Sequence, residues 1–499
     1  MSKDNFKKFF KENLDLVGAL DGSKAYAGPE IVQIDLTNNC NLNCVGCWCH
    51  SDFLGNLKLK GEEKKRNLPY GMVKKLIEDL HELGTKEIML SGSGEPFMYP
   101  RIMDVISLIK NKGIRLNIVT NFTLVNKDII KELIKLNVDN ITVSLWAGDA
   151  DTYVKTHPNQ TKKTLAKIRD NLKFLHSIKK ENNLPRVKIY NVISKFNYDK
   201  ISNMLDFALD TLVDYIEFQV IDAVQGKTDC LMLSESNKIS LFKQFKSLLK
   251  RDDCYAYGIN SFSTSKKFQK GKLNKEIKEF PGRFMKIPSK FTLKVWEGEK
   301  EGKKCICRVL TCPAKMTTWP PTEENPIIRE DKNLHIFRFK PYYCKSCKFF
   351  GICYANNLGE LKVQYLSILG FGSFIRRISN DLYKEKYDGN IIDSMPCYVG
   401  WIYARILTNG DVIPCCKAHL FSLGSLYEDS FKDIWFSKKY NKFREKAKKL
   451  KKSNPYFKKI ECYKECDNVG MNLELHRRIK DLSFFQKKRI LFEIKSDSI

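Results

Sequence analysis

The stretch TNNCNLNCVGCWCH, residues 37–50, carries four cysteines within ten positions. Cys40, Cys44 and Cys47 have the spacing CxxxCxxC, so one short loop presents three thiolates. Three thiolates can ligate three irons of a [4Fe–4S] cube and leave the fourth iron without a protein ligand. An open coordination position is what distinguishes a catalytic metal centre from a structural one.

Zinc is the alternative that this spacing leaves open. A structural zinc ion takes four ligands, and Cys49 or His50 could supply the fourth. The spacing alone does not decide between the two metals. The position of the loop favours a catalytic cluster, because the loop follows the first strand of a repeating strand–helix pattern.

Short β-branched runs alternate with amphipathic helical runs from residue 30 to about 222. The predicted strands are Ile31–Leu36, Glu87–Ser91, Arg115–Thr120, Asn140–Leu145, Arg186–Ile193 and Tyr215–Ile221. Apolar residues recur every three or four positions between them, as in Met72–Leu83 and Leu165–Ile178. This alternation predicts an α/β fold, a parallel sheet with right-handed crossovers that curls into a partial barrel. In such barrels the chemistry lies on loops at the C-terminal ends of the strands.

The rest of the chain divides by composition. Residues 1–29 are expected to form an N-terminal extension before a core at 30–230, and residues 231–300 a connector that begins with a helix near Leu241–Leu249. Residues 301–470 are expected to form a small cysteine-rich α+β domain, organised by metal instead of by a large apolar core. Residues 471–499 predict one basic amphipathic helix, Met471–Ile494.

Eleven more cysteines lie in the C-terminal half, and their spacing again allows either zinc or iron–sulfur clusters. They are Cys305, Cys307, Cys312, the compact triple Cys344, Cys347 and Cys353, then Cys397, Cys415, Cys416, Cys462 and Cys466. Twelve residues separate Cys397 from Gly410, and four separate Gly410 from Cys415. Cys230 and Cys254 stand apart and are expected to be ordinary thiols.

The cysteine loop, the strand order and the segment Ser93-Gly94-Glu95-Pro96 after the second strand resemble the radical S-adenosylmethionine (SAM) superfamily. The resemblance covers roughly residues 30–222. It implies a partial (β/α)6 barrel in which Cys40, Cys44 and Cys47 bind a [4Fe–4S] cluster. It also implies that Ser93–Pro96 hold the amino group of SAM, and that Asn121 and Ser144, at the ends of the third and fourth strands, contact SAM.

Two positions depart from the family pattern. Ser93 replaces the first glycine of the GGEP motif found in relatives, a change that a backbone contact should tolerate. Gly46 stands where most relatives place an aromatic residue beside the adenine of SAM. Trp48, on the other side of Cys47, is one candidate for this aromatic contact with the adenine. The alternatives are that the adenine stacks elsewhere and that Trp48 only packs against neighbouring residues.

The resemblance implies a mechanism in which the cofactor carries the difficult chemistry. The unique iron chelates SAM, one electron enters the sulfonium, and a 5′-deoxyadenosyl radical abstracts hydrogen from the substrate. A reductant such as ferredoxin or flavodoxin would supply the electron. Acid–base residues matter less in this scheme, so no catalytic residue is assigned beyond the cluster, and His50, His157 and His419 are expected to be structural or exposed.

The stretch Cys397–Cys466 resembles the SPASM auxiliary-cluster region, or its shortened twitch form. The matching features are a hairpin at Asn409–Cys416, then Gly424, a helix beginning at Ser430–Trp435, Arg444 and the Cys462/Cys466 pair. The resemblance implies one [4Fe–4S] cluster on Cys397, Cys415 or Cys416, Cys462 and Cys466. A second would use Cys344, Cys347, Cys353 and one of Cys305, Cys307 or Cys312, although this triple precedes the glycine motif, contrary to the family order. Auxiliary clusters favour a net oxidation or crosslinking of substrate, by analogy with relatives.

The formal net charge is +28, which attracts anions and favours a small anionic metabolite, sugar or lipid-like substrate. Residues 437–460 form the densest basic block, with eleven Lys or Arg and the single acid Glu445, and are a candidate contact for an anionic surface. A peptide-modifying maturase is the alternative; about 30 residues precede the first strand, fewer than an added recognition domain needs. A non-enzymatic zinc or iron–sulfur protein that binds nucleic acid is the alternative of another class, but no groove-reading motif supports it.

No membrane or export signal is evident. The first residues lack the apolar run of a signal peptide, and the longest apolar-looking stretch, 361–375, contains Lys362 and Gln364 and is too short to span a bilayer. A cytoplasmic location is therefore expected.

Overall fold

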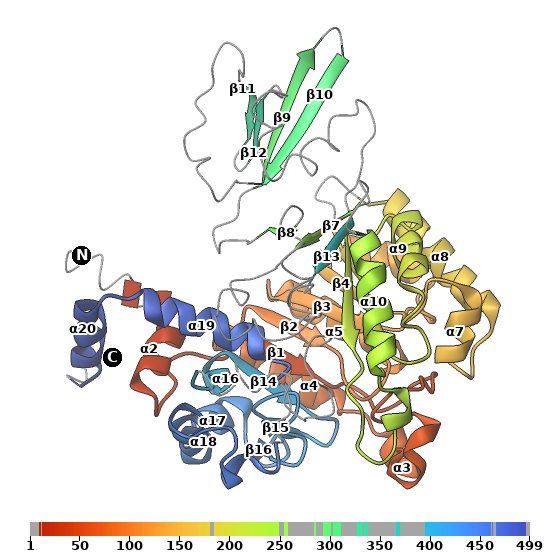
Figure 1. Ribbon diagram of the computed structural model, residues 1–499. Helices are drawn as coiled ribbons and strands as arrows, with labels where there is room; N and C mark the ends of the chain where they lie inside the picture. The colour runs from red at the N-terminus through yellow and green to blue at the C-terminus, as the bar shows by residue number, and fades with distance from the viewer. Residues whose placement is uncertain are drawn as a thin grey trace.

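The computed structural model describes residues 9–10, 12–179, 184–248, 395–460, 462 and 466–495, together with the bounds and pairing of seven strands between residues 254 and 369. Six parallel strands form the centre of its largest sheet in chain order (Figure 1). They are β1 (Ile31–Ile34), β2 (Glu87–Leu90), β3 (Arg115–Thr120), β4 (Asn140–Ser144), β5 (Arg186–Ile193) and β6 (Tyr215–Val220). The predicted α/β core is confirmed, and each strand ends within two residues of its expected bounds.

Helices connect these strands and cover the sheet (Figure 1). They are α2 (Leu14–Asp21), α3 (Gly61–Lys65), α4 (Tyr70–Glu82), α5 (Ile102–Asn111), α6 (Lys127–Lys135), α7 (Ala150–Thr156), α8 (Lys162–Ser177), α9 (Ile201–Asp210) and α10 (Glu235–Leu248), with short 3-10 turns at Asp52–Leu57, Pro96–Met98 and Asp229–Leu231. The periodic apolar residues face inward; in α4 these are Val73, Leu76, Ile77 and Leu80. Local signals fix helix starts, as where the Asn126 side chain accepts the Asp128 and Ile129 amides and caps α6.

The C-terminal part joins the same sheet at its β1 edge. The strand β14 (Tyr403–Ile406) pairs in parallel with β1, and the hairpin partner β15 (Asp411–Ile413) runs antiparallel to β14. The turn between them contains Gly410 at a φ of 80°, a left-handed conformation that favours glycine. The short β16 (Gly424–Ser425) completes this edge. The hairpin expected at Asn409–Cys416 is thus confirmed and becomes an extension of the core sheet.

The helices of this region are α16 (Val399–Ile402), α17 (Phe431–Phe436), α18 (Lys438–Lys449), α19 (Val469–Asp481) and α20 (Phe484–Lys495), with a 3-10 turn at Pro455–Phe457. The single helix expected at Met471–Ile494 is wrong, because the chain is extended at Leu482 between α19 and α20. Ser483 and Gln486 cause the break. The Gln486 amide donates to the Ser483 hydroxyl at 3.3 Å, and the Ser483 amide donates to the Gln486 side chain at 2.8 Å, a capping box that starts a new helix.

The remaining strands are β7 (Cys254–Tyr257), β8 (Phe284–Met285), β9 (Leu293–Lys300), β10 (Lys303–Leu310), β11 (Ile327–Asp331), β12 (Leu334–Phe337) and β13 (Leu366–Leu369). The strand β13 pairs in parallel with β6 and continues the large sheet through β7 and β8. Two antiparallel pairs, β9–β10 and β11–β12, are separate from that sheet. Within the described part of the chain, no helix combines the length and apolar character needed to cross a membrane.

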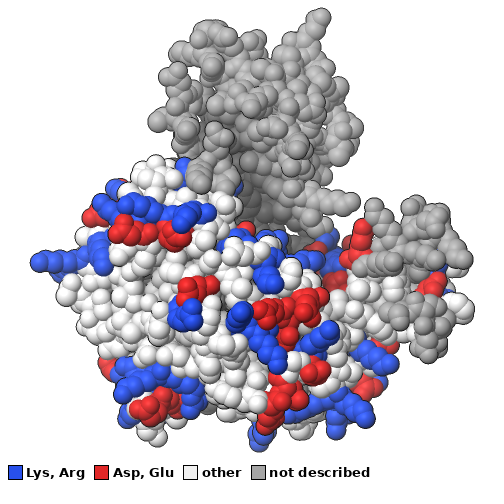
Figure 2. Space-filling model, turned by 180° about the vertical axis from the view of Figure 1, so that it is seen from behind, with Lys and Arg blue, Asp and Glu red and all other residues white. Residues whose placement is uncertain are grey.

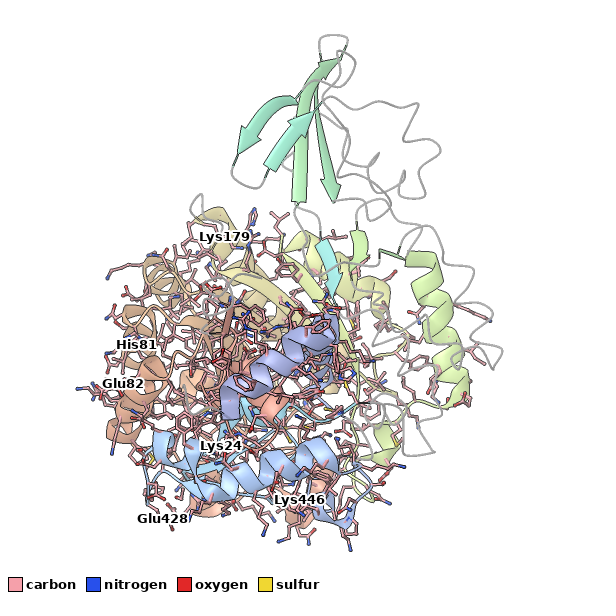
Figure 3. All side chains as sticks on the ribbon, turned by 90° about the vertical axis from the view of Figure 1, so that its left-hand side faces the viewer. Lys24, His81, Glu82, Lys179, Glu428 and Lys446 are labelled. Atoms are coloured by element: carbon pink, nitrogen blue, oxygen red, sulfur yellow. The ribbon has the colours of Figure 1, made fainter. Side chains whose placement is uncertain are left out.

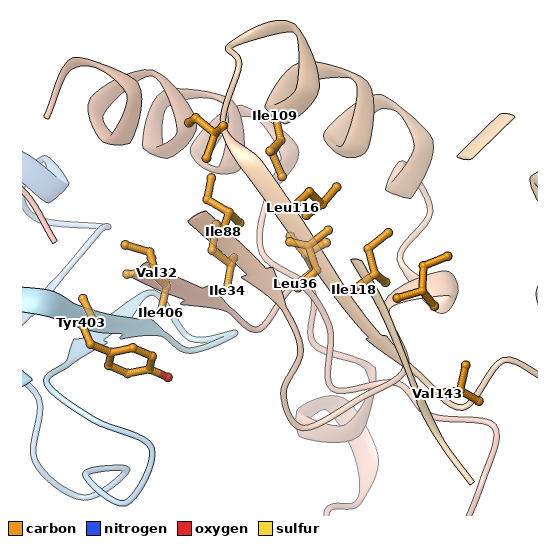
Figure 4. Packing of buried hydrophobic residues seen from close by; sticks show 14 of the residues in the cluster. Val32, Ile34, Leu36, Ile88, Ile109, Leu116, Ile118, Val143, Tyr403 and Ile406 are labelled. Carbon is orange, nitrogen blue, oxygen red and sulfur yellow. The ribbon is translucent and has the colours of Figure 1, made fainter. Parts of the chain in front are cut away.

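One apolar core runs through both halves of the described chain. Figure 4 shows Tyr403 and Ile406 of β14 beside Val32 of β1, and all three belong to the same buried cluster. Trp401 and Trp435 add large fully buried side chains from the C-terminal part. The domain expected at 301–470 to be organised by metal without a large core differs from this for its described residues from 395 onward, because burying β14 against β1 extends the main core.

Candidate functional site

A cavity of about 440 Å³ lies at the C-terminal ends of the central strands. The cysteine loop after β1 forms one wall, with Cys40, Cys44 and Cys47 all facing the cavity. Hydrogen bonds anchor the loop: the Val45 amide donates to the Thr156 carbonyl at 3.0 Å. The Ser51 hydroxyl donates to the Val45 carbonyl at 2.5 Å. The fold thus brings the three predicted ligands together at the end where barrel chemistry takes place.

The three thiols lie in a dry environment close to one another. Burial raises the pKa of Cys40 to about 11. Burial also raises the pKa of Cys44 well above its usual range, and the neighbouring Cys47 and Cys40 raise it further. Three thiols of one loop on one cavity wall are a donor set that fits a [4Fe–4S] cluster with one open iron. No three Cys, His, Asp or Glu side chains of the described residues are grouped so as to hold a single metal ion.

The segment after β2 packs directly against the cysteine loop. A side chain at Gly94 would lie 2.3 Å from the Asn39 carbonyl oxygen and 2.5 Å from that of Thr37. The Glu95 amide donates to the same Asn39 carbonyl at 2.7 Å. Glycine at position 94 is therefore required for this close approach, which presents Ser93 and Glu95 to the cavity. Pro96 begins the 3-10 turn Pro96–Met98 and is buried without lining the cavity.

Glu95 connects β2 to β3 by hydrogen bonds. Its carboxyl group accepts the Thr120 hydroxyl at 2.6 Å and the Asn121 amide at 2.7 Å. Burial raises the pKa of Glu95 to about 7, although these donors and the Phe97 amide favour the charged form. The Asn121 side chain in turn donates to the Asn41 side-chain oxygen at 2.9 Å, which ties the end of β3 to the cysteine loop.

The remaining predicted SAM contacts also reach the cavity. Ser144, at the end of β4, lines it and accepts a hydrogen bond from the Trp146 indole at 3.0 Å. Trp48 lines it as well, but its side chain is 41% exposed and its indole donates to the Asp222 carbonyl at 2.9 Å. The Lys417 ammonium group lies 4.3 Å from the Trp48 ring centroid and pairs with the Asp222 carboxylate. Trp48 is therefore engaged in a contact between the two halves of the chain.

His50 lines the main cavity, whereas Cys49, His157 and His419 do not. The His50 ring is hydrogen-bonded through Nε2 to the Ser93 carbonyl at 2.8 Å, and burial lowers its pKa. Burial raises the pKa of Cys49 to about 12. His157 is buried beside Tyr153, and His419 lines a neighbouring cavity together with Cys49.

Four C-terminal cysteines line a second, smaller and largely apolar cavity: Cys397, Cys415, Cys462 and Cys466. Their thiols influence one another: beyond the effect of burial, Cys462 raises the pKa of Cys415, and Cys397 raises that of Cys466. Cys416 lines the main cavity at the cysteine loop instead. Its sulfur lies 3.1 Å from the Tyr403 hydroxyl oxygen. The structure thus groups Cys415, and not Cys416, with the other three.

The second expected set of auxiliary ligands cannot be placed. Cys312, Cys344, Cys347 and Cys353 lie outside the described residues, and Cys305 and Cys307 fall in β10, where no side chains are described. Cys254 begins β7, again without a described side chain, and Cys230 is an exposed free thiol.

An ion pair beside the cavity was missed by sequence reasoning. The Arg405 guanidinium of β14 donates to both carboxylate oxygens of Asp35, at 3.0 and 2.7 Å, and to the Cys416 carbonyl at 3.1 Å. Burial alone would lower the pKa of Arg405. The adjacent Asp35 carboxylate has the larger effect, so the pKa of Arg405 is raised above its usual value. The two residues are 370 positions apart, so no sequence pattern links them.

The basic segment 437–460 is partly structural. Figure 3, in which Lys446 marks α18, shows this helix packed along the molecule. Arg444 is fully buried, with its guanidinium 4.3 Å from the Tyr440 ring centroid and donating to the Gly400 carbonyl at 2.8 Å. Burial lowers the pKa of Arg444 to about 10. On the face shown in Figure 2, basic and acidic residues lie side by side, so the basic excess gives no uniformly positive surface there.

Comparisons with known proteins identify two domains in the chain. Residues 34–208 match the radical SAM superfamily, and residues 397–467 match SPASM, an iron–sulfur cluster-binding domain. The chain is 27% identical over 185 residues to a tungsten-containing aldehyde ferredoxin oxidoreductase cofactor-modifying protein of Pyrococcus furiosus, covering 37% of this chain and 49% of that protein. It is 29% identical over 208 residues to a GTP 3′,8-cyclase of Clostridium perfringens, covering 40% of this chain and 58% of the cyclase. The chain therefore spans about half the length of these relatives.

Among solved structures, SuiB of Streptococcus suis bound to S-adenosylmethionine aligns with 94% of this chain and 80% of its own, with a TM-score of 0.48 and 13% identity.

Proposed function

Because this chain is a radical SAM superfamily protein with a C-terminal SPASM domain, as its sequence motifs indicated, we propose that it oxidises or crosslinks a substrate bound between the two domains. The two domains imply [4Fe–4S] clusters and SAM. When bound, these cofactors supply one-electron cleavage of SAM and a radical that abstracts hydrogen from the substrate. The protein residues bind SAM, orient the substrate and exclude water.

One observation supports a net oxidation more than any other. The cavity at the cysteine loop is also lined by Cys416 and Asp467, the immediate chain neighbours of Cys415 and Cys466. A substrate in this cavity would lie between the SAM loop and the auxiliary cysteines. An electron leaving the substrate would then have a short path to an auxiliary cluster held by those cysteines.

Roles for individual residues follow from the cavity. Cys40, Cys44 and Cys47 would hold the SAM-binding cluster, and Glu95, Asn121 and Ser144 present the polar groups suited to the methionine and ribose parts of SAM. The tight packing of Gly94 against the loop keeps these groups in register with the cysteines.

The test uses anaerobically reconstituted protein with dithionite and SAM. The wild type should release 5′-deoxyadenosine, whereas a Cys40→Ala/Cys44→Ala/Cys47→Ala variant should release none and retain auxiliary iron. Cys230→Ala is the matched control, because Cys230 is exposed and outside both cysteine sites, and it should behave as the wild type does. Nucleoside release by the triple variant, or protein that holds only zinc, would refute the proposal.

Substrates are identified by transfer of deuterium from labelled candidates into 5′-deoxyadenosine. Once one is found, a Cys397→Ala/Cys462→Ala variant should still cleave SAM but give no oxidised product. Formation of that product without the auxiliary cysteines would contradict the role of an auxiliary cluster as electron acceptor and leave the radical SAM assignment intact.

A further inference from the structure

A group of apolar side chains lies on one side of the cavity wall, among polar residues such as Ser144 and Gln219. On the β2–β3 side the wall presents Glu95 and Asn121. On the β4–β6 side the apolar groups are Trp146, Val192 and Ile221. These three belong to a local cluster with buried Val45 and Leu231. SAM has charged amino and carboxylate groups at one end and an aromatic adenine at the other, and the apolar group offers a surface for the adenine.

Trp146 occupies the space next to Gly46. A side chain at Gly46 would lie 2.6 Å from the Ile221 methyl group and 3.4 Å from the Trp146 ring. A large side chain at position 46 is therefore excluded by the residues already there. The aromatic surface that is absent at position 46 is supplied from the loop after β4.

Several contacts fix the Trp146 ring in this position. Its indole donates to Ser144, and its carbonyl accepts the fully buried Asn197 side chain at 2.9 Å. The His157 ring lies behind it, with the ring centroids 5.9 Å apart. Trp146 has a φ of 59°, a left-handed backbone conformation that is rare for a bulky residue and therefore strained. Strain of this kind persists where surrounding structure enforces it, often at ligand sites.

Trp48 is less suited to the same task. The Lys417 ammonium group lies over one face of its ring, and its indole donates to the Asp222 carbonyl. An adenine stacking on the Lys417 side of the Trp48 ring would have to displace that ammonium group.

We infer that Trp146, and not Trp48, stacks against the adenine of SAM and sets the affinity of the site for the nucleoside part of the cofactor. This inference rests on the proposed SAM site. Stacking of a base on an aromatic side chain is worth about 1–3 kcal/mol, which corresponds to roughly 5- to 150-fold in affinity.

The experiment measures equilibrium binding of SAM to reconstituted protein by anaerobic dialysis. Trp146→Ala should weaken SAM binding by roughly 5- to 150-fold, whereas Trp146→Phe, which keeps an aromatic face, should recover most of the affinity. Trp48→Ala should bind SAM as the wild type does. Iron content and circular dichroism of each variant establish that the cluster and fold are retained.

L-methionine separates a stacking role from a structural one, because it lacks the adenine. Its binding is followed by the change in the electron paramagnetic resonance spectrum of the reduced cluster. Trp146→Ala should leave that change intact if the residue acts on adenine. Equal losses for SAM and methionine, or a SAM loss in Trp48→Ala instead, would overturn the inference. Wild-type protein that assembles the cluster but binds no SAM would overturn the proposed function itself.

Discussion

His157 is a buried imidazole directly behind the Trp146 ring, and its ring stacks on Tyr153 with centroids 4.4 Å apart. Burial lowers the pKa of His157 to about 4, from 6.5 for the free side chain. The ring is therefore neutral near neutral pH, and the aromatic wall of the cavity carries no charge there.

This shift predicts a pH dependence of stability. Below pH 6.5 the His157 ring is protonated in the unfolded chain but stays neutral in the folded protein. The free energy of unfolding should therefore decrease as the pH falls from 6.5 to 4. The shift corresponds to at most about 3.5 kcal/mol. The midpoint of thermal unfolding should fall less over this range in His157→Phe than in the wild type. Parallel curves for the two proteins would show that His157 contributes nothing to the acid sensitivity.

The elements β1 and β14 form the junction at which the two domains share one sheet. The pair Asp35–Arg405 lies across this junction, and the Asp35 side chain is fully buried. Breaking a buried ion pair by removing one charge costs about 3–5 kcal/mol, because the other charge remains uncompensated. Replacing both charges by apolar groups of similar volume removes most of this penalty.

We expect Asp35→Asn to lower the thermal midpoint of the reconstituted protein strongly, by the equivalent of about 3–5 kcal/mol. The double variant Asp35→Leu/Arg405→Met should recover much of the loss. Thermal unfolding followed by circular dichroism compares the three proteins. If the double variant is as unstable as the single one, the pair contributes net stability beyond charge compensation.

Across the whole molecule, the C-terminal part supplies both a separate cysteine cavity and one edge of the main cavity. Cys415 and Cys416 are adjacent in sequence but face different cavities, since the chain passes between them. Cys415 and Cys416 therefore connect the cavity of the proposed auxiliary cluster with the cavity of the proposed SAM site.

This arrangement predicts different effects of two neighbouring substitutions. Cys415→Ser should lower the iron content by up to about four atoms per chain, the content of one [4Fe–4S] cluster. Cys416→Ser should retain the wild-type iron content, which makes it the matched control. Iron analysis and Mössbauer spectroscopy measure the outcome. Loss of iron from Cys416→Ser with none from Cys415→Ser would reverse the assignment.

Much of the core was predictable from local patterns. The period of apolar residues located β1–β6 and the helix α4, and the spacing of Cys40, Cys44 and Cys47 located the cavity loop, because each signal lies within one short segment. The capping box at Ser483 and Gln486 was also readable from the sequence, but a continuous amphipathic pattern obscured it.

By itself, the sequence determined the order of strands and helices and which cysteines form the loop after β1, since hydrophobic period and cysteine spacing are local properties of the chain. Only the tertiary structure decided that β14 pairs with β1, that Cys415 and not Cys416 joins the other cysteines, and that Trp146 fills the space beside Gly46. These outcomes depend on contacts between residues far apart in the chain. Packing and burial of the folded molecule select them, and no local pattern encodes them.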